Sequence, residues 1–279
     1  MVSRTGIVLR TAFFFLVFAI IPGSLWAASD MEKSPSPGPA PSRIVSLDLC
    51  TDWLLARYVS RARIAALSPM HRNFADAGMA AVDLADWPVH ANDPEQILRL
   101  QPDLVLVGAY NALLLRAYLE RLGLRVEVLS LPRTLAEVDA HERRLFALLG
   151  IPAARLPARP LPARMETTRR LLLLSPNGVG TGRDTLEDAM LTHAGWRNYV
   201  TTPGYSRVDL EKIAADPPDA VLWAAPKGAA QSSLLIAHPL WRRLLPAGWR
   251  FHMDTWPWQC PGPWTWETIR LLRAWRERM

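Results

Sequence analysis

Short apolar runs alternate with segments of helical spacing along most of the chain from residue 43 onward. In the first half, the apolar runs predict buried strands at residues 44–47, 64–67, 104–107 and 126–129. The segments between them predict helices at residues 51–59, 93–100, 113–122 and 135–149. Strands that alternate with helices are typical of a mostly parallel sheet with helices on both faces.

The alternation is interrupted between residues 151 and 168, where four prolines fall within eleven residues. A proline cluster between two similar patterns is typical of a domain boundary. The pattern then restarts with predicted strands at 171–174, 220–223 and 249–253 and predicted helices at 184–193, 209–215 and 264–276. We therefore expect an α/β fold with an N-terminal lobe at 43–133, an interlobe helix and connector at 134–168, and a C-terminal lobe at 169–279.

An internal repeat supports two lobes of similar build. Residues 93–108 read DPEQILRLQPDLVLVG, residues 209–224 read DLEKIAADPPDAVLWA, and seven of the sixteen positions are identical. Each copy predicts a capped helix, a Pro-Asp turn and a buried strand, with Asp93, Pro94 and Gln96 at capping positions in the first copy. The alternative is that a common helix–turn–strand unit recurs by chance.

The N-terminal residues 1–29 have the features of a signal peptide. Arg4 and Arg10 precede an apolar run at 11–21, and small residues follow a Pro-Gly pair. The alternative is an uncleaved anchor, although the run is shorter than the roughly 20 apolar residues that span a bilayer. Neither cysteine lies near the junction, which excludes a lipid-modified cysteine, and residues 30–42 predict a proline-rich linker. We expect a protein exported to the periplasm that is not a lipoprotein.

The composition narrows the classes of partner and metal site. The chain has 32 Lys and Arg residues against 26 Asp and Glu, without a run of five basic residues, so nucleic-acid binding is weakly supported. A basic cleft for an anionic ligand stays open. Two cysteines cannot form a disulfide-rich scaffold, and the spacing of Cys and His does not predict a zinc site.

These features together resemble the periplasmic substrate-binding proteins of ABC importers that carry cobalamin, haem and ferric siderophores. The resemblance runs from about residue 43 to the C-terminus. It rests on RIVSLDLCTDWLLA (43–56), RIAALSP (63–69), LGLRVEVLSLP (122–132), TLEDAMLTHAGWRNYV (185–200) and the two copies of the repeat.

The resemblance implies two parallel-sheet, Rossmann-like lobes joined by a single backbone helix, with the ligand cleft between them. It implies a monomer without catalytic residues, metal site or cofactor of its own, whose ligand is an iron or cobalt chelate. Its partner would be the importer permease in the inner membrane. The sequence departs from this pattern after Gly150, where the proline cluster predicts that the backbone helix is shortened.

The resemblance also implies a docking role for one exposed glutamate in each lobe. The matching residues are Glu95 and Glu211, at the start of the repeated helix, and their partners would be arginines of the permease. Two carboxylates on a pseudo-twofold surface suit a twofold partner. The alternative is that each glutamate only complements its helix dipole.

Candidate ligand-binding residues follow the predicted strands, because ligands of parallel α/β sheets bind beyond the carboxyl ends of the strands. These aromatic, basic and polar residues suit a large planar ligand with anionic groups. They are Asp48, Cys50, His71, Arg72, Tyr110, Asn111, Arg133, Arg183, Lys227, Trp256 and Trp258. For His71, axial ligation of haem iron or cobalt competes with a surface or capping role.

Two further features are expected at the cleft. Trp256 and Trp258, and likewise Trp264 and Trp266, flank a Pro-Gly-Pro loop, and we expect one tryptophan of each pair in the core and one exposed, with an all-core arrangement as the alternative. The glycines at 178, 180 and 182 have GxGxG rather than GxGxxG spacing and predict a turn that lines the cleft, not a nucleotide site.

Cys50 and Cys260 are predicted in loops that face the cleft from opposite lobes. In an oxidising compartment they could form a disulfide that restrains opening. Two free thiols, or contact of a thiol with the ligand, are the alternatives.

Three function classes follow from the sequence. The first is a binding protein that delivers a chelate to an importer. The second is an exported hydrolase, although Ser46, Ser68 and Ser175 stand at strand ends without a GxSxG elbow. The third is a sensor that uses the same fold without transport.

Overall fold

The computed structural model describes residues 39–73, 83–159, 168–175, 178–225, 235 and 237–279. The predicted signal peptide and Lys227 lie outside these ranges.

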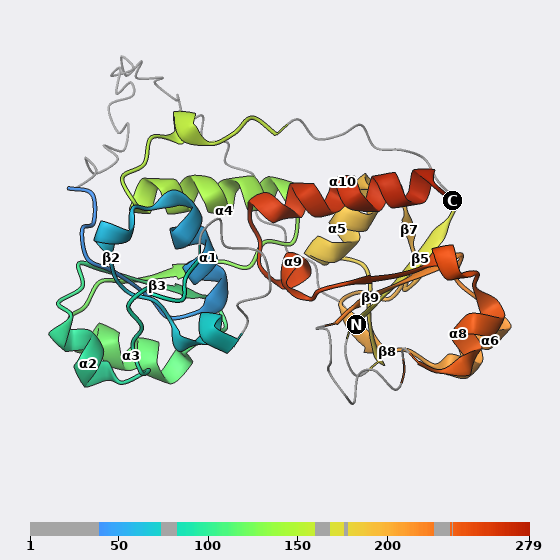
Figure 1. Cartoon of the computed structure of the whole chain (residues 1–279), viewed down its shortest axis with the longest axis horizontal. Helices are drawn as coiled ribbons and strands as arrows, with labels where there is room; N and C mark the ends of the chain where they lie inside the picture. Colours follow the sequence, from blue (N-terminus) through green and yellow to red (C-terminus); the bar gives the residue numbers. More distant parts are fainter. Residues whose placement is uncertain (1–38, 74–82, 160–167, 176–177, 226–234, 236) are drawn as a thin grey trace, which may run out of the picture. The chain divides into compact units, whose positions relative to one another are not determined.

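The first sheet is fully parallel, as the apolar runs predict. Its order is β2-β1-β3-β4, from β1 (Ile44–Ser46), β2 (Ile64–Ala66), β3 (Leu104–Gly108) and β4 (Val126–Leu129). One face packs against α1 (Leu49–Tyr58), and the other packs against α2 (Pro94–Arg99) and α3 (Leu113–Arg121). The helices on both faces are visible in Figure 1. Strands that are covered on both sides explain the continuous apolar runs.

The second sheet is mixed rather than fully parallel. Its strands β5 (Arg170–Ser175), β7 (Arg197–Asn198), β9 (Ala220–Ala224) and β10 (Arg250–Met253) pair in parallel. The strand β6 (Val179–Thr181) pairs antiparallel with β5 and with β8 (Tyr205–Arg207), which is an edge strand. Helices α5 (Leu186–His193) and α10 (Pro263–Glu277) cover one face, and α6 (Leu210–Ala215) and α8 (Pro239–Leu244) cover the other.

The repeat found in the sequence is also a structural repeat. The carboxylates of Asp93 and Asp209 accept hydrogen bonds from the N–H groups of Glu95 and Glu211, at 3.0 and 2.9 Å. In each turn an aspartate also accepts the N–H at the start of the neighbouring strand, Asp103 from Arg43 and Asp219 from Arg170. These matching bonds join β3 to β1 and β9 to β5. One prediction is wrong, because the Gln96 side chain accepts from the N–H of Ala91 and not from that of Asp93.

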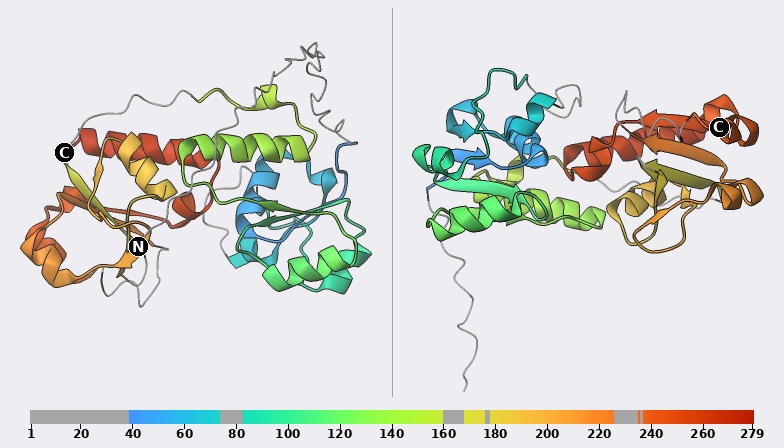
Figure 2. Two further views of the ribbon diagram at one scale, coloured as in Figure 1. Left: turned by 180° about the vertical axis from the view of Figure 1, so that it is seen from behind. Right: turned by 90° about the horizontal axis from the view of Figure 1, so that it is seen from below.

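Two helices pack against both sheets. In α4 (Leu135–Leu148), Val138 belongs to the core around the second sheet, whereas Leu145 belongs to the core around the first. In α10, Trp264 packs in the first core, and Leu272 packs in the second. Figures 1 and 2 show α4 and α10 along the same side of the sheets.

The backbone helix is short, as the proline cluster predicts. It ends at Leu148, and Gly150 follows with a left-handed φ of 66°, which favours glycine. The chain then returns along α4, where the Arg159 guanidinium forms an ion pair with the buried Glu142 carboxylate. The hydroxyl of Tyr58 in α1 donates to the same carboxylate at 2.7 Å. This network fixes the start of the connector against the first lobe.

Candidate functional site

A pocket of about 1210 Å³ opens at the carboxyl ends of strands from both sheets. From the first lobe it is lined by the start of α1 and by the segments that follow β3 and β4. From the second lobe it is lined by the start of α5, by β6 and by residues 203–205. The residues around α9 (Trp256–Gln259) complete the lining. This is the position that parallel α/β sheets favour for ligands.

The structure brings most of the predicted ligand-binding residues to this pocket. Those that line it are Asp48, Cys50, Tyr110, Asn111, Arg133, Trp256 and Trp258. His71, Arg72 and Arg183 are not among the lining residues, and the side chains of both arginines are exposed. Contact of any of these residues with a ligand stays a prediction.

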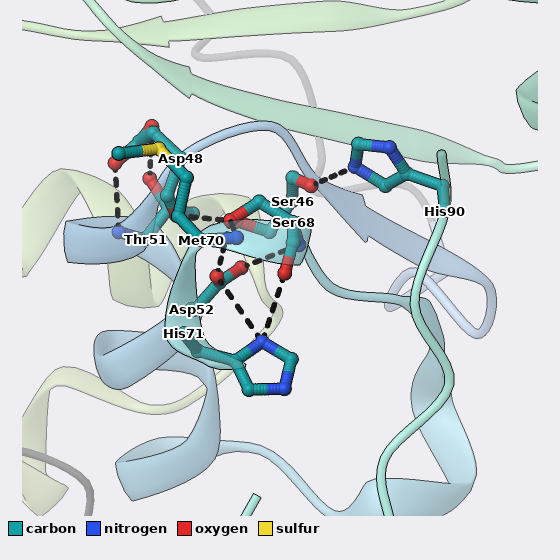
Figure 3. Close-up of polar contacts among 8 residues, drawn as sticks. All are labelled: Ser46, Asp48, Thr51, Asp52, Ser68, Met70, His71 and His90. Carbon is teal, nitrogen blue, oxygen red and sulfur yellow. Dashed lines mark hydrogen bonds and ion pairs between the residues drawn. The ribbon is translucent and has the colours of Figure 1, made fainter. Parts of the chain in front are cut away.

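His71 does not line the pocket, and its buried imidazole belongs to a polar network, which Figure 3 shows. Its Nδ1 lies 2.8 Å from the carbonyl oxygen of Ser68 and 3.7 Å from the Asp52 carboxylate. The nearby negative charge of the Asp52 carboxylate raises the pKa of His71 above its ordinary value. The imidazole therefore holds the turn after β2 together, and of the two roles left open for His71 this geometry favours the structural one over axial ligation.

The same network bears on the hydrolase alternative. The Ser68 hydroxyl donates to the Asp52 carboxylate at 2.5 Å, and the His71 imidazole contacts the Ser68 carbonyl rather than its hydroxyl. A nucleophilic serine needs its hydroxyl bonded to a base that can take its proton. Ser68 is therefore held as a turn residue, and its geometry is not that of an activated nucleophile.

Asp48 forms part of the pocket wall, and its carboxylate accepts hydrogen bonds from neighbouring segments of the first lobe. Its carboxylate caps α1 by accepting the N–H of Thr51 at 3.0 Å, and it also accepts the Thr51 hydroxyl at 2.8 Å. It further accepts the N–H of Gly108 at 2.6 Å, at the end of β3. Burial raises the pKa of Asp48, and these donors oppose that shift. Asp48 thus positions the lining segments after β1 and β3.

Glu187 and Tyr205 are pocket residues that the sequence analysis did not identify. The Tyr205 hydroxyl donates to the Glu187 carboxylate, at 3.0 and 3.2 Å from its two oxygens. Glu187 is only 7% exposed, whereas Tyr205 is 59% exposed. Burial raises the pKa of both groups. A glutamate in a first helical turn is common, so the sequence contains no signal for this pair.

The imidazole of His141, on α4, also lines the pocket. Its Nδ1 lies 3.0 Å from the carbonyl oxygen of Ser130, which can only accept, so Nδ1 carries the proton. Burial lowers the pKa of His141 and keeps the ring neutral.

The described lining is not basic, so it does not support the basic cleft that the sequence left open. Its charged residues are three acids, Asp48, Asp184 and Glu187, and one base, Arg133. The expected Arg72 and Arg183 are absent from it, and Lys227 lies outside the described residues.

The aromatic wall is partly as predicted. Trp256 is half-buried and Trp258 is buried, and both line the pocket. Trp264 and Trp266 are both buried in the core, so the expectation of one exposed member in that pair is wrong. The predicted glycine turn is instead the strand β6, although Val179 and Thr181 in it do line the pocket.

Cys50 and Cys260 form the disulfide that the sequence analysis considered. Their Cα atoms are 5.1 Å apart, and the bond joins positions 210 residues apart in the chain. Cys50 lies in the first turn of α1 and lines the pocket, whereas Cys260 is fully buried between α9 and α10. The bond links the first lobe to the C-terminal segment beside the pocket.

Solved structures with the same architecture are periplasmic binding proteins. A haem-binding protein from Pseudomonas aeruginosa is 23% identical, with a TM-score of 0.62, over 84% of this chain and 92% of that one. A haem-binding protein in complex with two haems is 21% identical, with a TM-score of 0.62, over 84% and 97%. The vitamin B12-binding protein of Vibrio cholerae is 16% identical, with a TM-score of 0.60, over 86% and 98%.

The chain has the fold of these binding proteins. The two-lobed fold that the resemblance implies is therefore confirmed. No protein-family model and no curated protein matches the sequence. Within the described ranges, no helix has the length and apolar character needed to span a membrane. The same ranges contain no group of three or more His, Cys, Asp or Glu side chains that could hold a metal ion.

Proposed function

We propose that this protein is the exported substrate-binding component of an ABC importer and that it captures a metal chelate in the periplasm. The observation that carries the proposal is the pocket between the lobes. Its volume of about 1210 Å³ is larger than the 300–1,000 Å³ of most small-molecule pockets, and its wall includes Tyr110, Tyr205, Trp256 and Trp258. A large ring or chelate can stack on such side chains. The structural neighbours that bind haem and vitamin B12 support this class of ligand.

Fluorescence titration of the mature protein tests the proposal. Cyanocobalamin, haemin and ferric siderophores are added in turn, with free tryptophan as the control for absorbance. We expect saturable quenching by at least one chelate at a dissociation constant of about 1 μM or lower, which corresponds to about 8 kcal/mol.

Two tryptophan variants show whether the quenching reports on the pocket. Trp256 lines it, whereas Trp249 packs beside the second sheet and does not. The Trp256→Phe variant should lose a larger share of the quenching than Trp249→Phe. The absence of a response to every chelate would contradict the proposed function.

We further propose that Glu95 and Glu211 dock the protein to its permease. Both side chains are exposed and hold the same position in the repeated helices α2 and α6. Each of these helices packs on the sheet face opposite to α4 and α10, so that both lie along one side in Figure 1. An arginine from each half of a twofold permease could pair with each carboxylate.

The hydrolase and sensor alternatives have less support. Ser68 is fully buried, and the His71 imidazole contacts its carbonyl oxygen rather than its hydroxyl, so a serine–histidine nucleophile is not formed there. No described feature favours a sensor over a transport component.

A further inference from the structure

The pocket contains a buried carboxylate whose hydrogen-bond partners carry no positive charge. Glu187 is the second residue of α5, and its side chain is only 7% exposed. The Tyr205 hydroxyl donates to its carboxylate, its own backbone N–H opposes the rise in pKa that burial causes, and the neighbouring Asp188 repels it. The Thr185 hydroxyl donates to the carbonyl oxygen of Gly182. Among the residues that the structure describes, no Lys, Arg or His lies within ion-pair distance of Glu187.

The surrounding wall does not offset this negative charge. Asp48 is acidic but fully engaged by Thr51 and Gly108, and Asp184 is an exposed second acid. Arg133 is the only basic residue in the described lining. The positive charge of Arg133 partly offsets the rise in the pKa of the Tyr205 hydroxyl that burial causes. Arg133 is nevertheless too far from Glu187 to form an ion pair with it.

We propose that Glu187 makes this pocket selective for chelates that present hydrogen-bond donors or positive charge, and selective against their carboxylate-bearing analogues. This inference rests on the proposed function and specifies the charge that the bound chelate should carry.

The physical reason is the cost of burying an ion without a partner. A buried carboxylate is destabilising until a donor or a cation satisfies it, and bonds to charged groups are the strong ones. An amide N–H, an ammonium group or a water on a metal can supply that partner. A carboxylate or catecholate of the ligand would instead bring a second negative charge close to the first. Selectivity then comes from repulsion as well as attraction.

Pairs of chelates that share one core and differ only in charge test the inference. The first pair is ferrioxamine B, which has a free ammonium group, and its N-succinyl derivative. The second is haemin dimethyl ester and haemin. The third is cyanocobalamin and a derivative in which one side-chain amide is hydrolysed to a carboxylate.

For whichever pair binds, the member without the added carboxylate should bind more tightly by about tenfold or more. The Glu187→Gln variant keeps the shape of the side chain and its acceptor oxygen but removes the charge. It should bring the ratio of the two dissociation constants close to one. The Glu120→Gln variant removes an exposed carboxylate that does not line the pocket and should leave the ratio near that of the wild type.

Three results would overturn the inference. In the first, the anionic member of a pair binds more tightly to the wild type. In the second, folded Glu187→Gln, checked by circular dichroism, keeps the wild-type ratio. In the third, Glu120→Gln changes the ratio as much as Glu187→Gln does. The proposed function survives each of these results, since a chelate still binds. Failure of every chelate to bind would contradict the proposed function itself, and this inference with it.

Discussion

At the scale of single residues, two buried carboxylates of the pocket wall differ in the hydrogen bonds that they accept. Asp48 accepts two backbone N–H groups and a hydroxyl, so it stabilises the segments that it joins. Glu187 accepts the Tyr205 hydroxyl and its own backbone N–H and stands next to Asp188, and burial still raises its pKa. Binding sites often retain groups that reduce stability because function needs them. We therefore assign Asp48 mainly to architecture and Glu187 to recognition.

The Glu187→Gln variant should be more stable than the wild type at about pH 7.5. Burial raises the pKa of Glu187 above its ordinary value of 4.5, so the folded state favours the protonated carboxyl. The wild type therefore loses free energy of unfolding as the pH rises from the ordinary pKa of Glu187 through its raised pKa in the folded state. Urea unfolding should give a higher midpoint for the variant at about pH 7.5, and the difference should shrink near pH 4. A variant that is no more stable at neutral pH, or a difference that grows on acidification, would show that the buried charge is compensated.

At the scale of elements, the repeated helix–turn–strand unit gives the two lobes matching surfaces. Asp93 and Asp209 cap their helices in the same way, which places Glu95 and Glu211 at equivalent exposed positions. A partner that binds both lobes could use this equivalence to set its register.

The double variant Glu95→Ala and Glu211→Ala should abolish or strongly reduce uptake in cells while the purified protein binds its chelate as before. The reason is that surface charges at a docking face govern association with the partner rather than the distant pocket. Uptake of labelled chelate and fluorescence titration measure the two effects separately. Glu120→Ala, in an exposed part of α3, is the control and should leave uptake unchanged. Normal uptake by the double variant would refute the docking role.

The elements that the sequence predicts well are those with local signals. The apolar run of β4 predicts its bounds, and Asp93 with Pro94 predicts the start of α2. The strands β6 and β8 were missed because β6 is glycine-rich and β8 is a short, largely exposed edge strand. Their antiparallel pairing depends on tertiary contacts. The same contacts bring Tyr205 to Glu187, which is 18 residues away in sequence. The sequence pattern likewise does not predict where a side chain points, as the example of His71 shows.

At the scale of the whole described unit, three connections tie the lobes together beside the pocket. Helices α4 and α10 each bury side chains in both cores. Trp53 of the first lobe contacts Trp256 and Trp264 edge-on, with ring centroids 5.8 and 6.3 Å apart. The disulfide between Cys50 and Cys260 adds a covalent link at the same place. Contacts from the C-terminal segment thus supplement the short backbone helix. Because these contacts hold the lobes together, we expect only small changes in lobe spacing when a ligand binds.

Removal of the disulfide tests this view of the connections. The bond closes a loop of 210 residues, and the entropy of such a loop corresponds to about 5 kcal/mol, although measured losses are usually about 2–5 kcal/mol. The double variant Cys50→Ala and Cys260→Ala should therefore unfold at a clearly lower urea concentration than the oxidised wild type. Alanine is preferred to serine at position 260 because that site is fully buried and would leave a hydroxyl unsatisfied.

Reductant provides the matched control for this prediction. Addition of a thiol reductant should lower the unfolding midpoint of the wild type toward that of the double variant. It should not affect the variant, because the chain has only two cysteines and the variant lacks both. The comparison separates the bond from the packing of the Cys260 side chain, since only the wild type can respond. Because the bond also holds the pocket wall at Cys50, its loss should speed release of a bound chelate. An unfolding midpoint that is equal in oxidised and reduced wild type would mean that α4, α10 and the tryptophans alone fix the lobes.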